Sequence, residues 1–233
     1  KDTAAGPSVT FAMRDPDGAN GYPGQVDVKV TYTLTHRNAL KIQYEAHTTK
    51  ATPINLTNHA YFNLLDAGAT PIGGHVLQVM ADRYTPVNKV QIPTGALAPV
   101  AGTPIDFRRP KPIGNDLAEM DKDPSGKNPS GYDHNLVLRK GSRFEKSVMV
   151  TEPQSGRTME MWTDQPGVQL YTGNFLDGKT TGRGGAVYGQ YHAFCLEAQH
   201  YPDSPNRRTF PSTILRPGGV YHQTTEYRFG VTK

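Results

Sequence analysis

The chain has 233 residues, of which 36% are hydrophobic and 20% are charged. This composition is typical of a folded globular protein and excludes a disordered one. The net charge of +4 comes from scattered lysines and arginines, which argues against the basic stripe of a nucleic-acid-binding protein. The single cysteine, Cys195, excludes an internal disulfide and a thiolate metal cluster, and its apolar neighbours indicate a buried core position.

No apolar run in the sequence has the length of a membrane-spanning helix, so no membrane partner is expected. The N-terminal residues contain no apolar core of a signal peptide, although a leader already removed would leave the same sequence. The compartment therefore stays open between the cytoplasm and, if an upstream signal was removed, the periplasm or the exterior.

The first predicted elements form a β-hairpin. Apolar residues alternate with polar ones over residues 26–34 and again over residues 40–46, with a turn at 36–38. Further short strands are predicted at Val76–Met80, Ser147–Thr151, Arg157–Thr163, Val168–Thr172, Phe194–Ala198 and Tyr221–Val231. The only helical segment expected is a short one at Ile113–Asp121.

Loops rich in glycine and proline separate these strands, and the chain contains 24 glycines and 19 prolines. No low-complexity linker or fixed repeat divides the chain, so residues 1–233 are expected to form a single domain. Many short strands without crossover helices predict an all-β fold, a large antiparallel β-sandwich whose loops and one sheet face carry the function.

Three segments place polar side chains among apolar strand residues. They are Thr52–Leu64, which contains His59, then Gly131–Leu136, and Phe194–Asp203, which contains Glu197. A carboxylate in an apolar strand is costly unless it is partnered or used, so Glu197 is a candidate functional residue. From the residues alone, His59 could equally be a hydrogen-bonded structural histidine, and Glu197 could only mark strand alternation.

Several chemistries compete for these residues. His59, His134 and His200 with Asp133 and Asp203 could be metal ligands, but no zinc-type histidine spacing is present and no metal is expected. A serine hydrolase is disfavoured because the sequence has no nucleophile-elbow motif. A glycosidase using Asp133 and Glu197 as paired carboxylates stays open. So does an acid–base pair of His59 and Glu197, whose side chains titrate near neutrality when tuned.

These segments are similar to the aldose 1-epimerase (galactose mutarotase) family, and the resemblance runs along nearly the whole chain. The motifs follow one order: Asp17-Gly18, Gly21–Gly24, Val30–Leu34, Thr52–Leu64, Ile92–Gly95, Gly131–Asn135, Gln165–Phe175, Cys195–Gln199, Pro202-Asp203, Phe210–Ser212 and Leu215–Gly218. The resemblance implies a galactose mutarotase-like supersandwich and the conversion between α and β anomers of hexoses such as galactose or glucose.

The resemblance also implies roles for single residues. His59, in the Asn-His-x-Tyr-Phe-Asn motif, is the expected general acid, and Glu197, in Leu-Glu-x-Gln, is the expected general base. Asp133 and Gln169 are expected to contact sugar hydroxyls. The list of expected substrate contacts is completed by Asn58 and Tyr61, from the same motif as His59.

The implied reaction needs a proton added to the ring oxygen and a proton removed from the anomeric hydroxyl, and it requires no cofactor. We expect His59, Asp133, Gln169 and Glu197 to converge on one open cleft. We also expect the imidazole of His59 and the carboxylate of Glu197 to face each other across the width of one sugar ring, without direct contact.

The chain departs from the family pattern at its beginning. A Gly-Arg followed by Asn-Arg and a Leu-His-Gly-Gly, both expected in the early part of the family domain, do not occur here. Roughly the first third of that domain is therefore expected to be missing, so that the sandwich is incomplete at the N-terminus and has open strand edges. We expect a second polypeptide, most simply the protein's own N-terminal fragment, to complete it.

Two other readings stay open. A non-catalytic carbohydrate-binding module of the same fold is compatible with the absent motifs, whereas the His59–Glu197 pair favours an enzyme. A hexose-6-phosphate 1-epimerase would need a basic phosphate pocket beside the same pair. In every case the expected partner is a monosaccharide.

Overall fold

The computed structural model describes residues 2–120 and 130–232, and every strand pairing between named strands in this part of the chain is antiparallel. The larger sheet has the order β1 (Asp2–Thr3), β2 (Gly6–Asp15), β3 (Val26–Leu34), β4 (Ala39–Thr48), β16 (Tyr221–Val231), β12 (Arg157–Thr163), β11 (Glu145–Thr151), β6 (Val76–Val79) and β9 (Lys111–Pro112).

The smaller sheet carries the candidate site. Its order is β14 (Cys195–Gln199), β13 (Gly167–Tyr171), β10 (Asp133–Leu138), β7 (Ala81–Tyr84) and β8 (Ala98–Pro99). A two-stranded ribbon joins β15 (Ile214–Leu215) to β5 (Thr52–Pro53). The described helices are short 3₁₀ turns: η1 (Ala19–Gly21), η2 (Ile72–Gly74), η3 (Ile113–Glu119), η4 (Arg183–Gly185) and η5 (Ser204–Asn206). None of the helices described is long and apolar enough to span a bilayer.

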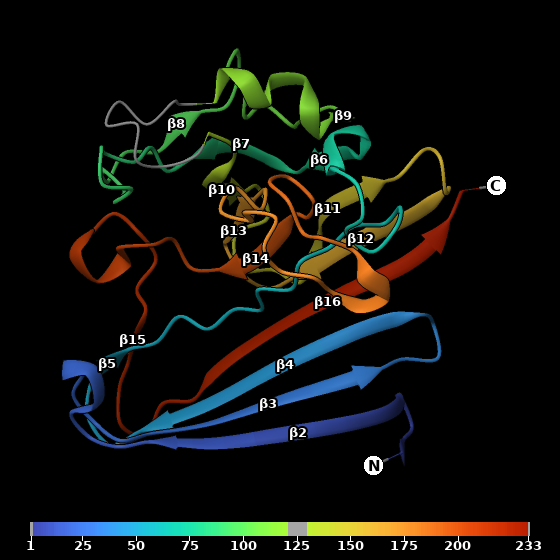
Figure 1. The fold of residues 1–233 in the computed structure, drawn as a ribbon. Coiled ribbons are helices and arrows are strands. Elements are labelled where there is room, and N and C mark those ends of the chain that lie inside the picture. The colour runs from blue at the N-terminus through green and yellow to red at the C-terminus, as the bar shows by residue number, and fades with distance from the viewer. Residues whose placement is uncertain (1, 121–129, 233) are drawn as a thin grey trace.

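The core lies between the two sheets, which form separate layers in Figure 1. Alternate residues of each strand point into this space because successive side chains of a strand face opposite sides of the sheet. The fully buried side chains come from both layers, among them Leu77, Val150, Met159 and Tyr227 of the larger sheet and Leu136, Val168, Leu170 and Leu196 of the smaller one. The predicted antiparallel sandwich is thus confirmed.

The predicted hairpin is confirmed as β3 and β4, which pair from Val26↔Thr48 to Leu34↔Leu40. Asn38, in the turn, has a φ of 54°, a left-handed conformation that asparagine tolerates better than most residues. The expected helix at Ile113–Asp121 forms as the 3₁₀ turn η3, and Asp121 lies outside the described residues. Strands β2, β7 and β10 and the two-residue strands β1, β5, β8, β9 and β15 were not predicted.

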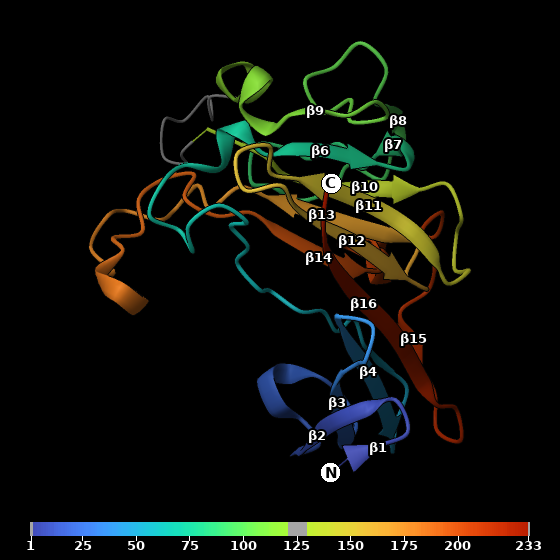
Figure 2. The ribbon, with the colours of Figure 1, turned by 90° about the vertical axis from the view of Figure 1, so that its right-hand side faces the viewer.

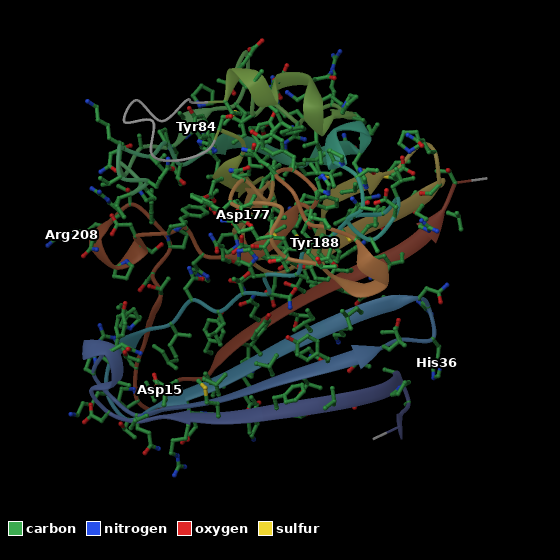
Figure 3. All side chains as sticks on the ribbon, viewed as in Figure 1. Asp15, His36, Tyr84, Asp177, Tyr188 and Arg208 are labelled. Atoms are coloured by element: carbon green, nitrogen blue, oxygen red, sulfur yellow. The ribbon has the colours of Figure 1, made fainter. Side chains whose placement is uncertain are left out.

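One end of the larger sheet extends beyond the cover of the smaller sheet. In both ribbon views β2 and β3 lie at one end of the molecule and β6 and β7 at the other (Figure 1 and Figure 2). Asp15, at the end of β2, and His36, in the β3–β4 turn, mark the two ends of this part of the sheet in Figure 3. Beyond β2 the sheet continues only with the two residues of β1, so β2 acts as an edge strand.

Candidate active site

The register of three neighbouring strands gathers polar side chains on one face of the smaller sheet. Gln169 of β13 lies opposite Glu197 of β14 and, on its other side, opposite Asn135 of β10. Asp133 pairs with Tyr171 two residues further along, on the same face. The residues between them belong to the core: Leu136, Val168, Leu170, Leu196 and Ala198. Strand alternation therefore explains how an apolar strand presents a carboxylate to a site.

The segment that carries His59 lies along the edge of β14. Phe62 and Phe194 exchange backbone hydrogen bonds of 2.8 and 3.0 Å, and the Thr57 hydroxyl donates to the Ala198 carbonyl at 2.9 Å. These bonds hold the segment before and after His59 against β14, the strand that carries Glu197. An irregular loop is thereby fixed in position by backbone contacts to a rigid sheet.

The two predicted catalytic side chains are in direct contact. His59 Nε2 lies 3.5 Å from Glu197 Oε1, and the imidazole is 48% exposed whereas the carboxylate is 11% exposed. The expectation of a sugar-wide gap between them is therefore wrong. The ring oxygen and the anomeric hydroxyl of a pyranose are bonded to the same carbon, so an acid and a base that serve these two oxygens need to lie close together.

Glu197 titrates in an unusual environment. Burial raises the pKa of its carboxyl above the ordinary value, and nearby Asp133 raises it further by like-charge repulsion, while the neighbouring His59 acts in the opposite direction. A base with a raised pKa binds a proton more strongly, which suits the removal of a proton from a hydroxyl group near neutral pH.

Asp133 and Gln169 form a second polar pair on the same face. Gln169 Nε2 donates a hydrogen bond of 2.7 Å to Asp133 Oδ1. Because a carboxylate oxygen only accepts, this bond fixes which end of the Gln169 amide faces Asp133. The pair thus presents a carboxylate in a defined orientation beside Glu197, as a contact for hydroxyl groups requires.

Aromatic rings enclose His59 on two sides. Tyr61 lies at 5.1 Å between ring centroids with its ring tilted 31° to the imidazole, and Tyr171 meets the imidazole edge-on at 5.8 Å. The Tyr171 hydroxyl accepts a hydrogen bond of 3.0 Å from the Phe175 backbone, which anchors its ring. Sequence reasoning missed Tyr171, although its spacing of two residues from Gln169 on a strand places both on one face.

Asn58, another predicted substrate contact, has a local structural role. Its Oδ1 accepts a hydrogen bond of 3.1 Å from the Ala60 backbone, closing an Asx turn around His59. Tyr61 lines a largely apolar cavity of about 620 Å³, whereas Asp133 and Gln169 line a separate cavity of about 100 Å³. The strand register and the contact between His59 and Glu197 place His59, Glu197, Asp133 and Gln169 toward one face of the smaller sheet, whereas their convergence on one open cleft stays a prediction.

Three of the residues considered as metal ligands, His134, His200 and Asp203, have other partners. His134 alternates with Asp133 and Asn135 on β10, so its side chain lies on the core side of the sheet, where it meets the Tyr84 ring edge-on at 6.2 Å. His200 Nδ1 lies 2.9 Å from Gln165 Oε1, and Asp203 pairs with Arg207 at 2.7 Å. Within residues 2–120 and 130–232 no cluster of three or more metal-binding side chains is found.

Comparisons with known proteins agree with this arrangement. The family model for aldose 1-epimerase matches residues 1–228. Galactose mutarotase of Mus musculus is 45% identical over 223 residues, covering 96% of this chain and 63% of that protein. Aldose 1-epimerase of Escherichia coli is 39% identical over 225 residues, covering 95% of this chain and 63% of that protein. The chain thus spans less than two thirds of the length of these relatives.

Solved structures give the same result for the fold. The crystal structure of an aldose epimerase homologue from C. elegans superposes with a TM-score of 0.85 at 33% sequence identity, covering 97% of this chain and 66% of that one. That of galactose 1-epimerase from Lactobacillus acidophilus superposes with a TM-score of 0.81 at 30% identity, covering 97% and 63%. This chain belongs to the aldose 1-epimerase family.

Proposed function

We propose that this chain carries the acid–base centre of an aldose 1-epimerase, an isomerase that interconverts the α and β anomers of hexoses such as galactose or glucose. The observation that carries the proposal is the 3.5 Å contact between the His59 imidazole and the buried Glu197 carboxylate. The names of the relatives, galactose mutarotase and aldose 1-epimerase, support the same reaction.

In the proposed reaction Glu197 acts as the base and protonated His59 as the acid. Glu197 takes the proton of the anomeric hydroxyl while His59 gives a proton to the ring oxygen, so the bond between C1 and the ring oxygen breaks and an open-chain aldehyde forms. The C1–C2 bond then rotates. Reclosure reverses both transfers. The hydroxyl formed from the former ring oxygen returns its proton to His59, and Glu197 returns its proton to the new anomeric oxygen.

The remaining predicted residues would hold the sugar. The Asp133–Gln169 pair supplies a fixed carboxylate beside Glu197, and carboxylates accept hydrogen bonds from sugar hydroxyls. Tyr61 is 49% exposed next to His59, so its ring can contact the apolar face of a pyranose. Asn58 contributes through the turn that it closes around His59 and through its free amide edge.

The geometry favours this reaction over a 6-phosphate substrate. A phosphate group would need lysine or arginine side chains beside the site. The described residues that line the cavities at Tyr61 and at Asp133 include neither lysine nor arginine. A neutral hexose therefore fits these surroundings better than a hexose 6-phosphate.

We also propose that residues 1–233 act as one domain whose β2 face is covered by a polypeptide segment outside this chain, most simply an N-terminal fragment of the same protein. Val9, Phe11 and Met13 alternate along β2 and are 48%, 61% and 61% exposed. Such a row on an edge strand favours pairing with further polypeptide. The matched relatives are long enough to supply a segment of this kind.

Polarimetry on freshly dissolved α-D-galactose tests the function. We expect the protein to accelerate the change in optical rotation well beyond the rate of buffer, and to act far more weakly on glucose 6-phosphate. The Glu197→Gln variant is the control for contaminating epimerase. If the wild type binds galactose but is no faster than Glu197→Gln, the protein is a carbohydrate-binding module and not an enzyme.

A further inference from the structure

A small cavity opens on the site face of the smaller sheet, on the side of Gln169 that faces β10. Its volume is about 100 Å³, enough for a few water molecules at about 30 Å³ each. The cavity is lined by Asp133 and Gln169, the proposed sugar contacts, and also by Asn135. The polar side chains that line it from the sheet and the following loop are Thr85, Gln91, Asp133, Asn135 and Gln169.

Two buried oxygen atoms at this cavity have no hydrogen-bond donor among the described residues. One is Gln169 Oε1, whose amide is oriented by the bond from Nε2 to Asp133. The other is Asn135 Oδ1, on a residue that is only 2% exposed. Because buried polar atoms are almost always paired, each of these acceptors calls for a donor.

The position of Asn135 is set by its neighbours. Its Nδ2 lies 3.4 Å from the Thr85 hydroxyl, and its backbone carbonyl accepts a hydrogen bond of 3.0 Å from the Thr85 backbone. A Cβ atom added at Gly167 would lie 2.5 Å from Asn135 Oδ1. The oxygen therefore occupies the space that the glycine leaves free, and less than 1 Å² of its surface is accessible to solvent.

We propose that Asn135 is a positioning residue for the Asp133–Gln169 pair, acting through an ordered water that donates hydrogen bonds to Asn135 Oδ1 and Gln169 Oε1. Asn135 and Gln169 are directly opposite in the β10–β13 register, so one water in the cavity can reach both. A water has two protons to donate, which matches two acceptors in a cavity with room for it.

The water holds the Gln169 amide with its Nε2 toward Asp133. Without this support the amide can rotate, and Asp133 loses this hydrogen-bond donor and its fixed orientation. This role deepens the proposed function, on which it rests, because Asp133 and Gln169 are the proposed contacts of sugar hydroxyls. Asn135 is not itself among the proposed sugar contacts.

Asn135→Ala tests the proposal through the split between KM and kcat for galactose. We expect KM to rise about three- to tenfold, the worth of one or two hydrogen bonds, and kcat to stay within about twofold. Asn135→Asp keeps an acceptor at the same place and should restore KM. It adds a negative charge near Glu197, so the pH limb governed by Glu197 should move to higher pH.

Gln223→Met is the matched control for the loss of a buried amide. Gln223 is 1% exposed and donates to the Ala198 carbonyl from the larger sheet, away from the cavity. We expect this variant to lower the melting temperature without moving KM. A second probe, Gly167→Ala, keeps the Asn135 amide but displaces its oxygen, and should raise KM as Asn135→Ala does.

A high-resolution crystal structure of the wild-type chain provides a readout that does not depend on turnover. It should show a water within hydrogen-bond distance of Asn135 Oδ1 and Gln169 Oε1. A dry cavity, or an unchanged KM in a folded Asn135→Ala variant, would overturn the positioning role. If the wild-type protein binds galactose without mutarotation, the proposed reaction fails, and the Kd of Asn135→Ala for galactose takes the place of KM.

Discussion

Two regions of this molecule reverse the usual distribution of side chains between core and surface. On the site face of β14 the ionisable Glu197 is 9% exposed, whereas on β2 the large apolar side chains Phe11 and Met13 are each 61% exposed. Both arrangements cost free energy in an isolated chain, since one buries a charge and the other leaves apolar surface in water. Each therefore marks a place where something else is expected to bind.

The surroundings of the two regions indicate different occupants. Glu197 has polar neighbours in a fixed arrangement: His59 at 3.5 Å, and the Asp133–Gln169 pair on the next two strands of the sheet. Such an array can bind and transform a small polar molecule. The β2 row lies on a strand that pairs with β3 along one side and, within the described residues, with only the two residues of β1 along the other, as in a strand that can accept a further strand or layer.

Removal of the Glu197 charge should have the largest effect. Glu197→Gln keeps the shape of the side chain but removes the base, so kcat for mutarotation of galactose should fall by about 10²- to 10⁴-fold. Galactose binding, measured by calorimetry, should stay within about tenfold of wild type. More than a tenth of the wild-type turnover in this variant would assign the base to another residue.

Replacement of His59 should have a comparable but smaller effect, because a half-exposed imidazole can be replaced in part by solvent. His59→Asn is expected to lower kcat by about 10²-fold and to flatten one limb of the pH–rate profile. His47→Asn is the matched control, since His47 also lies beside a glutamate, at 3.4 Å, but on β4 of the larger sheet. An unchanged profile in His59→Asn would remove His59 from the acid role.

Substitutions on β2 test the other half of the comparison. Phe11→Ser with Met13→Ser should leave the geometry of the site unchanged but reduce self-association of the isolated chain, measured by light scattering. If a covering segment is supplied in trans, its affinity should drop by at least about tenfold in the double variant. Equal scattering and equal affinity would show that this row is ordinary exposed surface.

Truncation of the aromatic contact at Tyr61 should have a more modest effect on activity. Tyr61→Ala removes the ring that lies 5.1 Å from the His59 ring and should raise KM about three- to tenfold. Tyr61→Phe keeps the ring and should stay close to wild type if stacking dominates. A loss in Tyr61→Phe equal to that in Tyr61→Ala would mean that the hydroxyl, and not the ring, contacts the sugar.

The site strands were predictable in part because their chemistry is local. The apolar alternation around Glu197 and around Gln169 is visible in the sequence, and the register then places the two side chains opposite each other. The closeness of His59 to Glu197 was not predictable, because it depends on the backbone bonds between Phe62 and Phe194, residues far apart in the chain. The pairing of Asn135 with Gln169 likewise depends on a register that only the folded sheet defines.

The strand β2 shows what alternation in the sequence cannot predict, namely whether a row of apolar side chains is covered. Its apolar residues at 9, 11 and 13 alternate as clearly as those of β3, although no strand was predicted there. Alternation alone also gives no information on which face is covered, because it is identical for a row packed against a second layer and for a row in solvent. Val28 of β3 is buried because Ile54 and Leu56 pack against it, whereas the β2 row is exposed, and both outcomes depend on contacts between segments distant in the sequence.

The smallest expected effect is on stability, and it depends on pH. The pKa of Glu197 is raised in the fold, mainly by burial and also by Asp133, so the folded state binds a proton that the unfolded state has already released. Stability from this group is therefore complete below the carboxyl's ordinary pKa and is lost as the pH rises through the folded pKa. Glu197→Gln cannot ionise, so it should melt at a higher temperature than wild type at pH 8 and at nearly the same temperature at pH 4. Asp203→Asn is the control with the opposite sign. Asn206 and Arg207 lower the pKa of the Asp203 carboxyl, so in the wild type its ion pair with Arg207 stabilises the fold at every pH above that pKa. The variant lacks this ion pair and should melt at a lower temperature than wild type over that range. A wild-type advantage over Glu197→Gln at pH 8 would show that the contact with His59 outweighs the cost of burying the charge.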